Sequence, residues 1–114
     1  MKLPNAASAN VRREKITHYL LSSEHPVGRH KARFFKILGF DRSTWEELAR
    51  SLQRHATEYA VSCVRETAFG NAYVIDGPLE TPSGRRPRVR TVWFLESGRD
   101  VAEFVTAYPV EKRG

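Results

Sequence analysis

Two basic residues near the start of a predicted helix have side chains that suit acid–base and charge chemistry. His25 stands in a loop just before a proline, and Lys31 follows six residues later. At about 100° per residue, Lys31 falls within the apolar arc of this helix. An inward-facing ammonium is costly unless it is paired or lies at the edge of a cleft, so Lys31 is a candidate functional cation. The alternatives are a lysine whose stem follows the core edge to water and an ordinary exposed loop histidine.

Arginines and hydroxyls recur at strand spacing in the last third of the chain. Arg86, Arg88 and Arg90 alternate with other residues, which places the three guanidiniums on one face of a strand. Such a row suits a phosphate backbone, although charges on an edge strand also block unwanted pairing. Thr106 and Tyr108 share a face of the next predicted strand at a separation of about 7 Å. They are candidate contacts for a phosphate or a base, but both residue types are also ordinary in strands.

These residue types together suit cleavage of RNA through attack by its own 2′-hydroxyl. That reaction needs a base, an acid and cations that stabilise the phosphorane. The residues expected to be catalytic are His25 as acid or base, Lys31 and Arg90 as phosphorane stabilisers, and Thr106 and Tyr108 as contacts to the phosphate or the base. The arginines expected to bind the substrate are Arg29, Arg86 and Arg88.

Motifs for other kinds of chemistry are missing from the sequence. It has no P-loop, HExxH, GxSxG or dinucleotide-binding pattern, and its three aspartates lie far apart. The single cysteine, Cys63, excludes an internal disulfide and a zinc site built from several thiolates. We therefore expect neither a metal nor a cofactor.

The composition is that of one small globular domain. With 114 residues, 40% of them hydrophobic and 28% charged, the chain is expected to form a single domain over residues 1–114. No apolar run reaches the roughly 20 residues that span a bilayer. Residues 1–11 also lack the apolar stretch of a signal peptide. We expect no membrane association and a cytoplasmic location.

Basic residues are segregated along the chain. The net charge of +6 divides into +6 over residues 1–40, −3 over residues 41–80 and +3 over residues 81–114. Fourteen of the 19 basic residues are arginines, whose planar guanidinium pairs with phosphate at two points. RNA is the first expected partner and an acidic protein the second. A basic charge that serves only solubility is the remaining interpretation.

Hydrophobic spacing predicts helices first and strands afterwards. Helices are predicted near 11–21, near 29–38 and from about 43 onward, where either Asp41 is the N-cap or Ser43 and Glu46 form a capping box. Strands are predicted at 59–67, 72–79, 86–96 and 103–110. The short turns between them favour sequential antiparallel pairing. The predicted class is α+β, with about three N-terminal helices packed on a four-stranded antiparallel sheet. Residues 1–9 are expected to be loosely ordered.

Several segments together resemble a known family. They are 19–35, 38–40, 76–79 with 83–84, 89–93 and 105–109. They resemble an uncharacterised bacterial domain family, of the domain-of-unknown-function type, found alone and at the C-terminal tips of polymorphic toxins. The layout is more distantly similar to metal-independent toxin ribonucleases of the barnase, EndoU, colicin and RelE types. In those proteins an N-terminal His or Lys and late-strand Arg, Thr and Tyr residues line the RNA site. The positions that this similarity implies are His25, Lys31, Arg90, Thr106 and Tyr108, with Thr91 as an added substrate contact.

The leading hypothesis is a metal-independent endoribonuclease, or a ribonuclease-like toxin domain, that acts on RNA phosphodiesters. Such a toxin is expected to have a cognate antitoxin or immunity protein as a partner. The alternative is a non-catalytic basic module that holds an acidic protein or a nucleic acid through Arg86, Arg88 and Arg90. A third hypothesis is an immunity or antitoxin component, although its basic charge matches a basic nuclease poorly.

Overall fold

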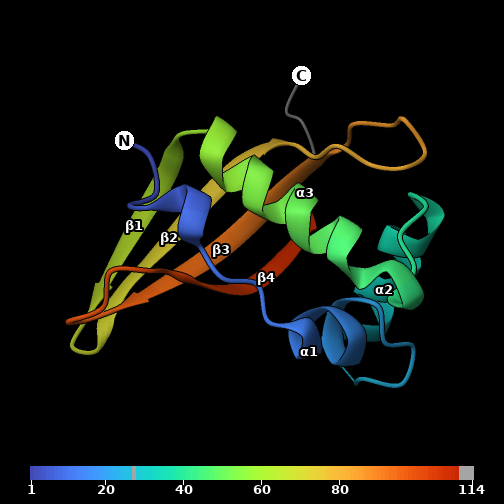
Figure 1. Ribbon diagram of the computed structural model, residues 1–114, viewed down its shortest axis with the longest axis horizontal. Helices are drawn as coiled ribbons and strands as arrows, with labels where there is room; N and C mark the ends of the chain where they lie inside the picture. Colours follow the sequence, from blue (N-terminus) through green and yellow to red (C-terminus); the bar gives the residue numbers. More distant parts are fainter. Residues whose placement is uncertain (27, 111–114) are drawn as a thin grey trace.

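The computed structural model describes residues 1–26 and 28–110, and its elements follow the predicted order of helices before strands (Figure 1). The helical elements are η1 (Ala6–Ser8), α1 (Arg13–Lys15), η2 (Ile16–Leu20), α2 (Gly28–Ile37), η3 (Arg42–Thr44) and α3 (Trp45–Glu58). The strands are β1 (Val61–Thr67), β2 (Gly70–Pro78), β3 (Arg88–Glu96) and β4 (Glu103–Pro109). The predicted α+β class is confirmed.

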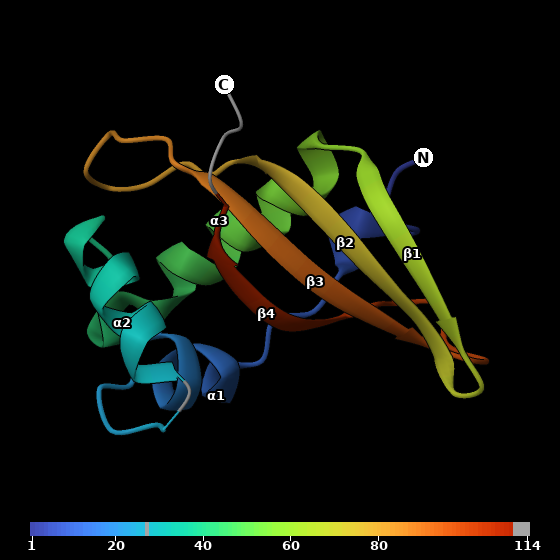
Figure 2. The same ribbon diagram turned by 180° about the vertical axis from the view of Figure 1, so that it is seen from behind.

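The strands form one antiparallel sheet in the order β1-β2-β3-β4. Each strand turns back beside the one before it, as the short predicted turns require. α3 lies across one face of the sheet (Figure 1), and the described elements leave the other face open (Figure 2). η2 and α2 lie beside β4 at one end of the sheet (Figure 2). The side chains of Tyr19 on η2 and Lys31 on α2 contact Thr106 on β4.

The apolar stripe of α3 builds the core against the sheet. Leu48, Leu52 and Ala56 recur at helical spacing and are fully buried. Trp93 on β3 is also fully buried, and its ring meets that of Phe104 on β4 edge-on at 5.4 Å between centroids. Burial of each large apolar side chain contributes about 1.5–3 kcal/mol. These contacts fix the sheet relative to α3.

A β-bulge in β4 decides which face its side chains occupy. Thr106 pairs with Val92 and Phe104 pairs with Trp93, so Val105 is the extra residue of the bulge. Strict alternation would put Phe104 and Thr106 on the same face. The bulge instead lets Phe104 enter the core while Thr106 turns to the open face, where it is only half-buried.

The start of the first helix differs in detail from the prediction, and the start of the third helix follows one of its two predicted alternatives. The first predicted helix is a short α-turn followed by the π-helical η2, in which the Leu21 N–H donates to the Ile16 carbonyl at 2.8 Å. At the third helix, the Asp41 carboxylate accepts the Ser43 N–H at 2.9 Å and caps η3, which leads into α3. The sequence allowed this cap as well as a capping box, and the structure adopts the former.

The first nine residues pack against the body of the protein, which differs from the expected loose order. Leu3 and Ala9 are buried. The Ala9 carbonyl accepts a hydrogen bond from the Gln53 side chain at 2.8 Å, and the Lys2 ammonium donates to the Glu58 carbonyl at 2.7 Å near the end of α3. Buried apolar contacts and satisfied helix-end carbonyls hold this segment in place.

A buried histidine ties α3 to the two central strands. His55 Nε2 lies 3.0 Å from the carbonyl oxygens of both Gly77 and Val89. His55 Nδ1 lies 3.2 Å from Thr91 Oγ1, which also accepts the Trp93 Nε1–H at 2.9 Å. The arrangement that satisfies every atom has the ring proton on Nε2, donated to the two carbonyls, and the Thr91 hydroxyl donating to Nδ1. The ring is therefore held neutral.

Folding stability is expected to fall as the pH drops from about 7 to about 5. Burial lowers the pKa of His55 below its ordinary value, although the hydrogen bonds to the Gly77 and Val89 carbonyls act in the opposite direction. Below about pH 6.5 the unfolded chain then binds a proton that the folded chain does not. Urea unfolding across this range measures the effect. His55→Gln is expected to flatten the slope of the unfolding free energy against pH. The same substitution at the exposed His30 is expected to leave that slope unchanged. Equal slopes in both variants and the original chain contradict the expectation.

Candidate active site

The ammonium of Lys31 joins three elements that are distant in sequence. From α2 it donates to the Tyr19 hydroxyl of η2 at 2.5 Å and to Thr106 Oγ1 of β4 at 3.1 Å. The two hydroxyls are themselves 3.0 Å apart, so the three groups form a closed triangle. Lys31 is half-buried, and no carboxylate among residues 1–26 and 28–110 forms an ion pair with it. A cation held by hydroxyls keeps its full charge for an anionic ligand.

Aromatic rings surround the same ammonium. Lys31 Nζ lies 4.9 Å from the centroid of the Tyr19 ring and 5.7 Å from that of the Tyr108 ring. Ring faces attract cations and help to hold the amine away from bulk water. Arg90 Cζ lies 6.0 Å from the Tyr108 centroid. Tyr108 therefore stands beside both predicted phosphorane stabilisers.

Arg90 is oriented by a carboxylate on the neighbouring strand. Its Nε and Nη2 donate to the two oxygens of Asp76 at 2.8 and 2.9 Å. This hydrogen-bonded pair holds the pKa of Asp76 below its usual range and raises that of Arg90. Two of the five guanidinium N–H groups are used in this way, and the Tyr108 hydroxyl is a further hydrogen-bond partner of Arg90. Arg90 thus offers a fixed donor edge with a partly compensated charge.

Tyr19 and His25 are two neighbouring residues whose side chains can exchange protons. Their rings meet edge-on at 5.0 Å between centroids. Burial raises the pKa of Tyr19, but the hydrogen bonds from Lys31 and Thr106 and the charges of Lys31 and Lys15 outweigh it, so the pKa lies below its ordinary value. His25 Nδ1 accepts the Gly28 N–H at 2.9 Å. In its neutral form the His25 ring therefore carries its proton on Nε2.

Tyr19 is expected to ionise below the usual tyrosine pKa of about 10. The physical reason is that the adjacent Lys31 ammonium stabilises the phenolate. Titration of tyrosinate absorbance in the wild-type chain, with the titration of Tyr19→Phe subtracted, isolates this residue. In Lys31→Met the pKa is expected to return upward. A measured pKa of Tyr19 at or above about 10 in the wild-type chain contradicts this expectation.

A glycine allows η2 and α2 to approach closely enough to form the triangle. A Cβ added at Gly28 would overlap the backbone carbonyl of Tyr19. The first turn of α2 therefore lies directly against η2. This contact fixes the distance between Tyr19 and Lys31, which is three residues further along α2.

Comparison with known proteins places the chain in a family. It matches the family described as Domain of unknown function (DUF6883) over residues 2–111. The chain belongs to the DUF6883 family. No curated protein sequence matches it.

The DUF6883 domain is also similar to a chain in a solved structure. That structure is described as a "Contact-dependent growth inhibition toxin - immunity protein complex" from Klebsiella pneumoniae 342. The TM-score is 0.68 at 16% sequence identity, and the match covers 88% of this chain and 98% of that chain. At this identity the likeness concerns the fold.

Five of the predicted site residues gather at one corner of the DUF6883 domain. They are His25, Lys31, Arg90, Thr106 and Tyr108, each half-buried, where η2 and α2 meet the open face of β3 and β4. We call these residues, together with Tyr19, the Lys31 cluster. Sequence reasoning missed Tyr19 and Asp76, neither of which was among the predicted site residues. The Asp76–Arg90 pair follows from the strand register, in which the two residues are direct partners.

The other predicted substrate contacts lie outside this corner. Arg29 is exposed on α2, and Arg88 is exposed at the start of β3. Arg86 precedes β3 and donates to the Tyr59 hydroxyl at 3.4 Å. Thr91 needs a correction as a substrate contact, because it is fully buried on the α3 face and its hydroxyl is bonded to His55 and Trp93. The strand alternation itself places Thr91 opposite Arg90.

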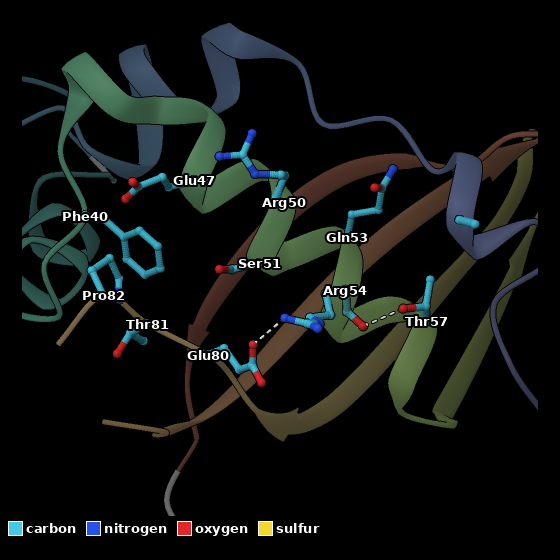
Figure 3. Close-up of a pocket in the computed structure, with 11 residues that line it drawn as sticks. Phe40, Glu47, Arg50, Ser51, Gln53, Arg54, Thr57, Glu80, Thr81 and Pro82 are labelled. Carbon is cyan, nitrogen blue, oxygen red and sulfur yellow. Dashed lines mark hydrogen bonds and ion pairs between the residues drawn. The ribbon is translucent and has the colours of Figure 1, made fainter. Parts of the chain in front are cut away.

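A separate cavity of about 640 Å³ lies between α3 and the segment 80–82 (Figure 3). Its lining carries two arginines, Arg50 and Arg54, and two glutamates, Glu47 and Glu80, and Arg54 pairs with Glu80 at 2.6 Å. Charges that compensate one another in this way leave little net field for a ligand.

Among the residues that the structure describes, no group of three or more His, Cys, Asp or Glu is arranged to hold a metal ion. Within the same residues, no helix is long and apolar enough to cross a membrane.

Proposed function

We propose that this DUF6883 domain is a metal-independent endoribonuclease of the toxin type, with its active site at the Lys31 cluster. The observation that carries the proposal is the convergence of the Lys31 ammonium, the Tyr19 and Thr106 hydroxyls and the Tyr108 ring from three separate elements. A half-buried ammonium without a carboxylate partner among the described residues suits a phosphate that gains charge in the transition state.

In the proposed reaction the 2′-oxygen of the substrate forms a bond to the adjacent phosphorus while the bond from phosphorus to the 5′-oxygen breaks. The products are a 2′,3′-cyclic phosphate and a free 5′-hydroxyl. Lys31 stabilises the charge on the non-bridging oxygens of the phosphorane. The edge of the Arg90 guanidinium that faces away from Asp76 binds the same phosphate, and Asp76 keeps its orientation fixed.

Tyr19 and His25 carry the two proton transfers. The Tyr19 phenolate, favoured by Lys31, takes the proton of the 2′-hydroxyl. His25 faces the leaving 5′-oxygen with Nε2–H. In its imidazolium form, reached by protonation of Nδ1 and release of the Gly28 N–H, His25 gives the Nε2 proton to that oxygen. Thr106 positions Lys31 and Tyr19 through its hydroxyl.

Incubation of the purified chain with single-stranded RNA in excess chelator tests the proposal. RNA is expected to be shortened, while a DNA oligonucleotide of the same sequence stays intact because it lacks the 2′-hydroxyl. RNA that remains intact in the presence of folded protein contradicts the proposal. If that folded protein still binds the RNA, the non-catalytic binding module becomes the better description.

The fold similarity favours a second role, the binding of a cognate protein. The similar chain comes from a complex of a toxin with its immunity protein. We propose that an immunity or antitoxin protein covers the Lys31 cluster of this domain, with acidic residues opposite Lys31 and Arg90. Co-purification of such a protein that abolishes RNA cleavage supports this role, whereas a partner that leaves cleavage unchanged contradicts it.

A further inference from the structure

The side of α2 that points away from Lys31 carries a second group of cations. Arg29, Arg33 and Lys36 fall within an arc of about 60° around the helix, roughly opposite Lys31. We call these three residues the α2 basic face. They line a cavity of about 560 Å³, and its lining among the described residues contains no acidic side chain. Ile37, with 65% of its surface exposed, adds an apolar part to the same lining.

The α2 basic face costs the helix stability. Arg29 and Arg33 are exposed and four residues apart, and like charges at this spacing repel each other. The first turn of α2 has no acidic residue, so cations stand at the end of the helix where the dipole favours anions. Within residues 1–26 and 28–110, neither arginine forms an ion pair, unlike Arg90 and Arg54. An anionic ligand would relieve both unfavourable effects.

We propose that the α2 basic face binds phosphates of the RNA strand that flank the phosphate held at the Lys31 cluster. This inference rests on the proposed function and adds a substrate class to it: single-stranded RNA that extends several nucleotides beyond the cut. A helix is about 10–12 Å across. A strand that reaches both sites therefore passes around the N-terminal end of α2, where His25 stands. Planar guanidiniums pair with phosphate at two points, and exposed Ile37 offers a surface for a base.

Salt-dependent binding of a non-cleavable oligonucleotide tests the inference. The probe is a fluorescent single-stranded RNA of ten nucleotides with 2′-O-methyl groups, titrated at several salt concentrations. For single strands the slope of log K against log salt falls by about 0.7 for each phosphate that the protein no longer neutralises. Arg29→Gln/Arg33→Gln is therefore expected to reduce the slope by about 1.4. The matched control Arg42→Gln/Arg50→Gln removes two exposed charges elsewhere and is expected to keep the wild-type slope.

Cleavage of a ribodinucleotide separates this inference from the proposed function. Such a substrate is too short to reach the α2 basic face, so its cleavage by the wild-type chain tests the proposed function alone. An equal change of slope in both double variants overturns the inference. Poly-glutamate serves as a second probe that stands for an acidic protein. The inference is also overturned if Arg29→Gln/Arg33→Gln loses binding to poly-glutamate but keeps binding to the oligonucleotide, because the α2 basic face then serves an acidic protein. If the slope depends on Arg29 and Arg33 but the wild-type chain cleaves no RNA, the nuclease proposal fails and the RNA-binding face stands.

Discussion

Lys31→Met is expected to lower the rate of RNA cleavage by about 10²–10³-fold, the usual effect of removing one electrostatic stabiliser from a transition state. Methionine keeps most of the length and apolar stem of lysine but supplies neither charge nor N–H groups. The variant also loses the hydrogen bonds to Tyr19 and Thr106, each worth about 0.5–1.5 kcal/mol. The fold should therefore survive, which circular dichroism and urea unfolding verify.

The measurement is the single-turnover rate on one RNA substrate, with Arg42→Met as the matched control. Arg42 is an exposed cation at η3, so this control removes the same charge without touching the Lys31 cluster. We expect Arg42→Met to cleave at nearly the wild-type rate. A folded Lys31→Met protein that keeps the wild-type rate removes Lys31 from the mechanism.

Thr91→Val is expected to lower the free energy of unfolding by about 2–6 kcal/mol without slowing RNA cleavage by the folded molecules. Valine fits the space of threonine but leaves His55 Nδ1 and the Trp93 Nε1–H without their partner. Each buried polar group left unsatisfied costs about 1–3 kcal/mol. The expected loss of stability is large for a substitution that changes so few atoms, because Thr91 is fully buried between the His55 and Trp93 side chains.

The same substitution at Thr106 is the matched comparison. Thr106 is half-buried in the Lys31 cluster, so Thr106→Val should change stability little. We expect its cleavage rate to fall by about 10–100-fold, because Lys31 and Tyr19 lose the group that positions them. Urea unfolding gives the stability, and single-turnover cleavage at a temperature where both variants are folded gives the rate. A folded Thr91→Val protein with reduced cleavage would return Thr91 to the substrate site.

The sheet was predictable because its signals are local. Gly84 and Gly98 lie in connections between strands and Gly70 begins β2 directly after the first connection, and each has a positive φ that few other residues adopt. Short connections leave sequential pairing as the simple topology. The apolar stripe of α3 is a similarly local signal, and its residues Leu48, Leu52 and Ala56 are buried.

The candidate site was only partly predictable because its geometry depends on contacts between distant segments. Lys31 stood out because a cation interrupts an apolar arc. Tyr19 gave no such signal, since a tyrosine on an apolar helix face is ordinary, and its role arises from the close approach that Gly28 allows. The bulge at Val105, which lets Phe104 enter the core while Thr106 lies on the open face, is also invisible in the alternation.

The ends of the RNA products test the central claim most directly. Mass spectrometry of products made by the wild-type chain in excess chelator should find a 2′,3′-cyclic phosphate on one fragment and a 5′-hydroxyl on the other. A single 2′-deoxynucleotide at the cut position should block that cut, and Lys31→Met should yield the same ends at a much lower rate. Fragments with 5′-phosphates, or cleavage that persists at the deoxynucleotide, would contradict attack by the 2′-hydroxyl at the Lys31 cluster.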